Sequence, residues 1–293
     1  MMGVVIVVVH VVVAIVLLTV VPIGLRLVAG PEVAALRRVW WTPAGLAVVS
    51  LWLPRGPLTG ALTLPYLLLT AALAAAAAWR AATATGLVRR AGLVRRAPGP
   101  GHPWPAQLAV LTALAMPLIG ASALTAERYG YLLFGFELDV LALTVAHFHV
   151  AGFTAALVAA LVSRQSGRGP LAASAALCVP AGTLVVLAGF FLGDEIELVG
   201  ATVLTAGMWA AGWLTWRHVR PTAPDRRTRA LLATSSVVLA ATMVLALSWA
   251  LGEATGLPHL PIGWMAATHG VANALGFGLC GVLAWRRLRV PAI

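Results

Sequence analysis

The chain has 293 residues, of which 61% are hydrophobic and only 10% are charged. A water-soluble domain carries about 25% charged residues, so this composition excludes a soluble globular fold and predicts that lipid is the main solvent. The formal net charge is +11, and all 20 basic residues are arginine. They cluster between apolar segments, which is typical of topology signals and contacts with anionic lipid headgroups. This pattern favours the lipid bilayer, and not nucleic acid, as the partner.

Nine apolar segments are candidate membrane spans, since a span needs about 20 apolar residues. The first has no basic region before it and is too long for the core of a signal peptide, so we expect it to remain as a span. The second is short and ends at Pro54, so a re-entrant segment is the alternative there. We predict an all-α polytopic membrane helix bundle in a single domain, 1–293, with these spans: 3–26, 39–53, 58–79, 105–125, 140–163, 171–192, 199–216, 230–251 and 262–285.

The arginines predict the orientation of this bundle. With nine spans and the C-terminus inside, 18 of the 20 basic residues fall on the cytoplasmic side, as the positive-inside rule expects. Only Arg55 and Arg128 then lie outside. The longest inner connection, 80–104, is a cationic loop rich in proline and glycine. Most acidic residues fall at the opposite, outer ends of the spans, which predicts an outer rim that attracts cations or protons.

Histidines recur at one depth within the predicted spans. His10, His147 and His269 each precede the next cytoplasmic arginine by 16 or 17 residues, which places all three in the outer part of the membrane. His149 lies two residues further in. An ionisable side chain is costly in lipid and usually faces the bundle interior, so we expect a shared site that includes His147 and His269. The alternative is a set of core histidines satisfied by backbone carbonyls or hydroxyls.

Helical geometry limits how these histidines combine. His147 and His149 are separated by about 200° of rotation, so their rings point to opposite sides of a regular helix. Asn273 follows His269 by four residues and therefore shares its face. We expect Asn273 to orient a ligand or bind substrate.

Two resemblances rest on short motifs. "HFHVAGF", the later "THGVANALGF" and "LWLPRGPLTGALTLPYLLLT" together resemble the YndJ-like family of polytopic bacterial membrane proteins. This resemblance implies a multi-pass protein of the bacterial cytoplasmic membrane and no particular activity. "AHFHV" is also similar to the His-x-His helix of haem–copper oxidases, where two histidines hold two haems on opposite faces. The chain departs from that pattern, because it has no paired copper histidines and fewer spans than the usual twelve.

Three functions are compatible with these patterns. The first is an outer-facing intramembrane site that binds a transition metal or haem for redox or hydrolytic chemistry, with His147, His269, His149 and His10 as candidate ligands. Its supporting groups would be Asn273, Glu127, Asp194 and Glu195. The second is a proton-coupled transporter of small solutes, because intramembrane histidines and carboxylates serve as proton relays. The third is a scaffold or assembly protein whose polar residues lock helices together.

Overall fold

The computed structural model describes residues 2–85, 104–167 and 169–293, and every regular element within them is helical. Most of the predicted cationic loop therefore lies outside the described residues. Eight helices in the described part are long and apolar enough to cross a membrane. This confirms the predicted all-α polytopic bundle. The eight are Val5–Leu25, Pro57–Ala84, Trp104–Tyr129, Leu138–Gln165, Pro170–Leu192, Asp194–Thr222, Arg226–Thr255 and Ile262–Leu288.

Four of these spans are uninterrupted α-helices: α5 (Pro57–Ala84), α7 (Trp104–Tyr129), α10 (Pro170–Leu192) and α12 (Arg226–Thr255). The other four contain a stretch of π- or 3₁₀-helix. The first span consists of α1 (Met2–Ile15), η1 (Val16–Val20) and α2 (Val21–Leu25), and the span after α7 consists of α8 (Leu138–His147), η3 (Phe148–Thr154) and α9 (Ala155–Gln165). The remaining two consist of α11 (Asp194–Leu214), η4 (Thr215–Val219) and η5 (Arg220–Thr222), and of α13 (Ile262–Met265), η6 (Ala266–Gly270), η7 (Ala272–Leu279) and α14 (Cys280–Leu288).

The second predicted span, 39–53, differs from a full crossing. Its helix α4 (Trp41–Leu51) has 11 residues, which cover only about 16 Å of a hydrocarbon core of about 30 Å. The helix before it, α3 (Pro31–Arg38), begins beside Arg80 near the end of α5, where Arg80 binds Glu32. The two short helices together therefore return the chain from one end of the bundle to the other.

Buried polar contacts fix the course of this broken segment. Midway along it, the Trp40 indole donates a hydrogen bond to the Leu17 carbonyl in η1 at 2.9 Å. At its far end, the Arg128 guanidinium donates to the carbonyls of Ser50 (3.1 Å) and Leu53 (3.2 Å). Ser50 lies in the last turn of α4, and Leu53 lies two residues beyond the end of the helix, where carbonyls run short of backbone partners. Arg128 thus satisfies the end of α4.

The two ends of the bundle carry opposite charge. Every described arginine except Arg55 and Arg128 lies at the end where the C-terminus is found, which we call the arginine end. Two acidic residues lie there, and each is paired: Glu32 with Arg80, and Asp225 with Arg287. The Thr228 N–H and Arg287 together lower the pKa of Asp225 to about 2. At the other end, which we call the acidic end, lie Glu127, Glu137, Asp139, Asp194, Glu195, Glu197 and Glu253.

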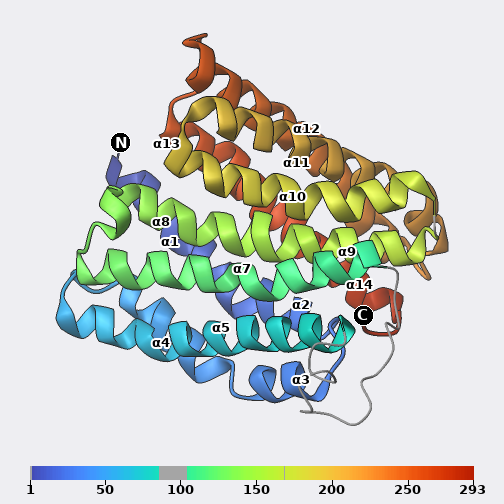
Figure 1. Cartoon of the computed structure of the whole chain (residues 1–293), viewed down its shortest axis with the longest axis horizontal. Helices are drawn as coiled ribbons and strands as arrows, with labels where there is room; N and C mark the ends of the chain where they lie inside the picture. Colours follow the sequence, from blue (N-terminus) through green and yellow to red (C-terminus); the bar gives the residue numbers. More distant parts are fainter. Residues whose placement is uncertain (1, 86–103, 168) are drawn as a thin grey trace.

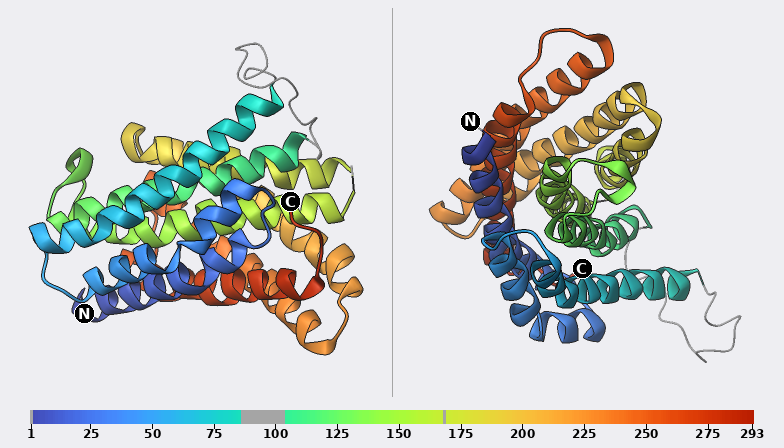
Figure 2. Two further views of the ribbon diagram at one scale, coloured as in Figure 1. Left: turned by 90° about the horizontal axis from the view of Figure 1, so that it is seen from below. Right: turned by 90° about the vertical axis from the view of Figure 1, so that its left-hand side faces the viewer.

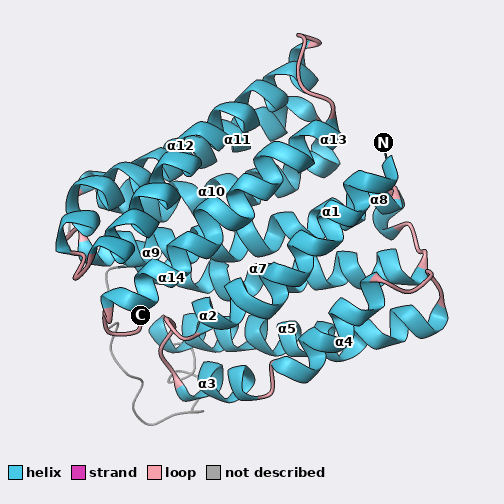
Figure 3. Cartoon of the chain, turned by 180° about the vertical axis from the view of Figure 1, so that it is seen from behind, coloured by secondary structure: helices cyan, strands magenta, loops and turns pink. Residues whose placement is uncertain are grey.

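The spans form two groups that meet along the middle of the molecule. Helices α10, α11 and α12 make one group, and α5, α7, α8 and α1 make the other (Figure 1). The last span runs diagonally between them, against α1 on one side and α12 on the other (Figure 3). Seen toward the acidic end, the connection from α12 to α13 projects beyond the other helices (Figure 2). The functional candidates lie where the two groups meet.

Small residues let α10 and α11 pack at very short range. A Cβ added to Gly182 would overlap the backbone of Leu204, and one added to Gly200 would overlap the backbone of Val186. In lipid, such close approach replaces the hydrophobic driving force that holds soluble helices together. This contact holds the face of α11 that carries Glu197 in a fixed position.

Candidate intramembrane cavity

A cavity of about 540 Å³ lies between the two groups of helices, with walls from α1, α8, α10, α11, α12 and the last span. Its volume is within the range of small-molecule sites, which is about 300–1,000 Å³. Most of the lining is aliphatic or aromatic. The lining residues come mainly from the parts of these spans nearest the acidic end, and they reach inward to Phe277. The cavity therefore lies between the apolar helices, in the half of the bundle nearest the acidic end.

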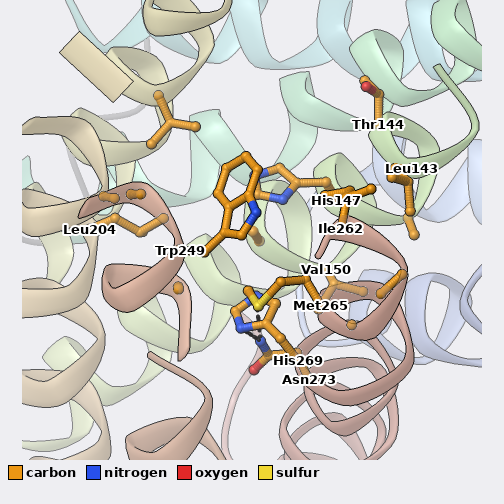
Figure 4. Close-up of a pocket in the computed structure, with 18 of the residues that line it drawn as sticks. Leu143, Thr144, His147, Val150, Leu204, Trp249, Ile262, Met265, His269 and Asn273 are labelled. Carbon is orange, nitrogen blue, oxygen red and sulfur yellow. Dashed lines mark hydrogen bonds between the residues drawn. The ribbon is translucent and has the colours of Figure 1, made fainter. Parts of the chain in front are cut away.

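Two of the predicted histidines line this cavity together. His147 is contributed by the last turn of α8, and His269 by η6 in the last span (Figure 4). The Nε2 atom of His147 is inaccessible to solvent and has no hydrogen-bond partner among the described residues. A buried nitrogen without a partner costs free energy, so the His147 ring carries an unsatisfied polar atom behind the part of its surface that lines the cavity.

His269 is held by a short chain of hydrogen bonds. Its Nδ1 lies 2.8 Å from the Thr242 carbonyl, which can only accept, so Nδ1 carries the proton. Its Nε2 then accepts from the Asn273 amide nitrogen at 3.1 Å. The Asn273 amide oxygen lies 2.8 Å from the Thr242 hydroxyl, which fixes the orientation of the amide. Asn273 thus orients His269, and both line the floor of the cavity.

His149 faces away from the cavity. Its Nδ1 donates to the Val145 carbonyl at 2.7 Å, and its Nε2 accepts from the Tyr66 hydroxyl of α5, also at 2.7 Å. The side chain is completely buried, and Gly120 of α7 leaves the space for its ring. The structure therefore separates His149 from His147 and gives it two satisfied partners in the packed core.

The other candidates also lie away from the cavity wall. His10 is on the opposite side of α1, where its ring meets Trp52 edge to face at 5.7 Å. Glu127 is 1% exposed and binds Arg55 at 2.8 Å, with Arg128 beside it. Asp194 and Glu195 are exposed in the first turn of α11. None of these four is among the cavity-lining residues.

Four residues at the site were not among the predicted candidates. Glu197 and Glu253 line the cavity near the acidic end, and Trp249 lines it between them and the histidines. Periodicity is the signal that could have found Glu197, because Ala201, Leu204 and Met208 follow it at helical spacing and line the same wall.

The fourth residue, His259, binds Glu253 from the connection between α12 and α13. Its Nε2 lies 2.6 Å from the Glu253 carboxylate, and its Nδ1 lies 2.9 Å from the Leu257 carbonyl. The Leu257 carbonyl, followed by Glu253, raises the pKa of His259 above its ordinary value. Glu253 lines the cavity near the acidic end, which we call the cavity mouth. We call the Glu253–His259 pair the latch, and its contacts favour the protonated form of His259.

The donor set does not fit a metal centre held by three protein ligands. In the part of the chain that the structure describes, no group of three histidine, cysteine or acidic side chains is arranged to hold a metal ion. A haem bound between two axial imidazoles would need a free nitrogen on both His147 and His269. Both ring nitrogens of His269 already have partners, Thr242 and Asn273.

Comparison with known proteins identifies the family. The family model described as "YndJ-like protein" matches residues 11–277, which is most of the chain. No curated protein and no solved structure matches it. The chain therefore belongs to the YndJ-like family, as the sequence motifs predicted. The match runs from within α1 to within η7 and includes every cavity-lining residue except Val8 and Val9.

Proposed function

We propose that this YndJ-like membrane protein binds a small molecule in the intramembrane cavity and moves it across the membrane together with protons. The observation that carries the proposal is a cavity of about 540 Å³ with carboxylates near its mouth and imidazoles at its depth. Apolar walls with a few convergent polar groups are typical of small-molecule sites. Intramembrane acidic and histidine side chains are typical parts of proton pathways.

Proton coupling is supported by the order of the titratable groups along the cavity. Glu197 and Glu253 are nearest the acidic end, with His259 bound to Glu253. His147 lies deeper, and His269 with Asn273 forms the floor. Between Phe277, at the inner limit of the cavity, and the arginine end, the described spans contain no acidic side chain. A ligand entering from the acidic end thus meets carboxylates first and imidazoles second.

The same arrangement ranks the alternatives. Metal or haem chemistry would require ligands beyond His147 and His269, and His149 and His10 face other helices. A scaffold would have its polar side chains paired between helices, as His149 and Glu127 are. A cavity of about 540 Å³ that His147, His269 and Asn273 line together favours ligand binding over both.

For the setting of this activity, we propose a single membrane domain in the bacterial cytoplasmic membrane, with the N-terminus outside and the C-terminus inside. The separation of arginines to one end of the bundle supports this orientation through the positive-inside rule. In this orientation the loop 80–104 is cytoplasmic. The cavity then opens toward the outer face.

Uptake into liposomes tests the proposal. Purified protein is reconstituted, a pH gradient is imposed, and accumulation of three membrane-impermeant naphthalene probes is measured: a trimethylammonium, a sulfonate and the zwitterionic naphthylalanine. We expect at least one probe to accumulate only with protein and a gradient. His147→Gln should slow that uptake by about tenfold, the effect of losing one buried hydrogen bond to a ligand.

The control is His218→Gln, because His218 is exposed at the arginine end and outside the cavity. It should transport like the wild type. If no probe accumulates, or if His147→Gln and His218→Gln behave alike, the proposed function is wrong. Elemental analysis and an absorption spectrum of the same preparation complete the test, because stoichiometric metal or haem would restore the first alternative.

A further inference from the structure

The charge of the cavity is opposite to that of the chain. The whole protein carries 20 basic and 9 acidic residues. Among the residues that line the cavity, the formally charged side chains are Glu197 and Glu253, and no arginine lines it. In the low dielectric of a membrane interior, two nearby carboxylates create a strong preference for positive charge. The preference of the cavity for positively charged ligands therefore comes from its own lining residues and is opposite to what the net charge of the whole chain would favour.

The two carboxylates differ in how they are held. Glu253 is paired with His259 at 2.6 Å, so its charge is partly balanced. Glu197 is half-buried where α11 meets Gly189 of α10, and its carboxylate makes no hydrogen bond or ion pair within the described residues. The side chain of Glu197 is therefore the available counter-charge for a cation that enters the cavity.

Deeper in the cavity, the lining rings and aliphatic side chains suit an organic body rather than a bare ion. The His147 Nε2 and the Trp249 Nε1 are both inaccessible to solvent and have no hydrogen-bond partner in the part of the chain that is described. Figure 4 shows both rings at the cavity with His269 and Asn273. An indole ring also attracts a cation to its face. The remaining walls, such as Leu204 and Met265, are apolar.

We infer that the ligand is a small hydrophobic amine in its protonated form, whose ammonium group binds Glu197 and whose apolar body lies between Trp249 and the aliphatic walls. This inference rests on the proposed small-molecule binding and names its substrate class. An anionic ligand meets no positive side chain in the cavity. A hydrated metal cation would leave most of the apolar wall unused. A protonated amine uses both the carboxylate and the apolar surface.

A matched set of probes tests the charge preference. The probes are 2-naphthylmethylamine, 2-naphthylmethanol and 2-naphthoate, which share one apolar body and differ in charge. Binding to wild-type protein in nanodiscs is measured at pH 7 by naphthalene fluorescence, with empty nanodiscs as background. We expect the amine to bind at least about tenfold more tightly than the alcohol, since hydrogen bonds to charged groups are among the stronger ones. The carboxylate should bind most weakly.

Two variants locate the effect. Glu197→Gln should remove most of the preference for the amine and leave the affinity for the alcohol within about twofold, well under the tenfold expected of one charged contact. Glu195→Gln is the matched control, because Glu195 lies in the same turn of α11 but is exposed and outside the cavity lining. It should bind all three probes like the wild type.

The outcomes separate the two proposals. If the alcohol or the carboxylate binds as well as the amine, or if Glu195→Gln weakens the amine as much as Glu197→Gln does, the inferred substrate class is wrong while small-molecule binding stands. If no probe binds above background, both this inference and the proposed function are overturned. Loss of binding of all three probes in Glu197→Gln would indicate a misfolded variant, and Glu197→Asp then decides: it must keep the amine preference for the inference to stand.

Discussion

At the scale of single residues, His147 and His149 show how two like side chains in one motif acquire different roles. His147 ends at the cavity wall, whereas His149 lies between Val145 and Tyr66 in the packed core. The sequence predicts their opposite directions from the helical rotation alone. It gives no means of knowing which side of the segment holds a cavity and which holds Tyr66, because that depends on the packing of α5 and α12.

The first prediction concerns the Tyr66–His149 pair. Because the Nδ1 of His149 donates to Val145, its Nε2 depends on the Tyr66 hydroxyl for a donor. Tyr66→Phe leaves that buried nitrogen unpaired, which should cost about 1–3 kcal/mol of stability. Thermal unfolding in detergent should show a lower melting temperature with unchanged probe binding. Tyr131→Phe, at an exposed site, is the control. An unchanged melting temperature in Tyr66→Phe would refute the structural role of this pair.

The second prediction concerns pH and the latch at the cavity mouth. His259 has a raised pKa, so its pairing with Glu253 is fully formed below its ordinary value of 6.5 and is lost as pH rises through the higher folded value. The Trp249 ring of α12 meets the His259 ring edge to face, and on the cavity side Glu253 lies near Glu197 of α11. Deprotonation of His259 frees the Glu253 charge. Amine affinity should therefore increase as pH rises from about 6 to about 8, on either side of the ordinary histidine value.

Measuring the affinity of 2-naphthylmethylamine across this range checks the prediction. Its ammonium form dominates throughout, as expected for an alkylamine with a pKa similar to that of lysine. In His259→Gln the pH dependence should be much weaker, because Glu253 no longer has a titrating partner. An equally steep dependence in His259→Gln would assign the titration to another group and remove the latch from the account.

At the scale of elements, three π-helical stretches meet in the interior of the bundle. η1, η3 and η7 come from three different spans and contact one another in the centre of the bundle. His149 lies in η3, and Asn273 lies in η7. Such stretches often occur at functional sites, because one extra residue per turn changes which side chains face inward. Periodicity computed for a regular α-helix places residues beyond them on the wrong face.

The third prediction tests the contact between α10 and α11. Gly182→Val would place a branched side chain against the backbone of Leu204, which cannot move without shifting α11. We expect a loss of stability of about 1–3 kcal/mol or more, the usual cost of overpacking. Amine binding should also weaken, because α11 carries Glu197. Gly212→Val is the control, since a Cβ at Gly212 meets its neighbours only at ordinary contact distance, 3.6 Å or more. Equal effects at the two positions would contradict the proposed close packing.

The fourth prediction tests the anchor at the end of α4. Arg128 is 3% exposed and binds Glu127 as well as the carbonyls of Ser50 and Leu53. Removing one member of a buried ion pair costs about 3–5 kcal/mol, because the partner charge stays buried. Arg128→Gln should therefore strongly lower the melting temperature. The double variant Glu127→Gln, Arg128→Gln should recover part of the loss. If the double variant is less stable than Arg128→Gln, the pairing of Glu127 with Arg55 matters more than its pairing with Arg128, which contradicts this prediction.

At the scale of the whole molecule, the fold follows largely from the sequence. Apolar runs of the right length predict the eight long spans, and the distribution of arginines predicts which ends of the spans lie together. The prediction was wrong in detail at 39–53. There the chain forms two short helices, α3 and α4, which meet at Val39 and Trp40, and buried contacts through Trp40 and Arg128 hold them in place of one continuous span.

The site follows from the sequence only in part. Equal depth predicts His147 and His269 in one region, and both line the cavity; helical spacing predicts Asn273 beside His269, and the two are hydrogen-bonded. The sequence could not show that His10 faces Trp52, or that Glu197 rather than Asp194 or Glu195 lines the cavity. The depth of a residue in the membrane follows from its position along its own span. The helices that its side chain faces depend instead on which spans are neighbours. That information lies in contacts between residues far apart in sequence.

Thiol labelling across the membrane shows whether a ligand cavity is open at the acidic end. Cys178 and Cys280 are replaced by alanine, and Thr144, which lines the cavity, is replaced by cysteine. A membrane-impermeant cationic methanethiosulfonate is added to intact cells with and without 2-naphthylmethylamine. The account predicts labelling from the outside that slows when the amine is present. Labelling only after the cells are opened, or labelling that the amine leaves unchanged, would contradict it.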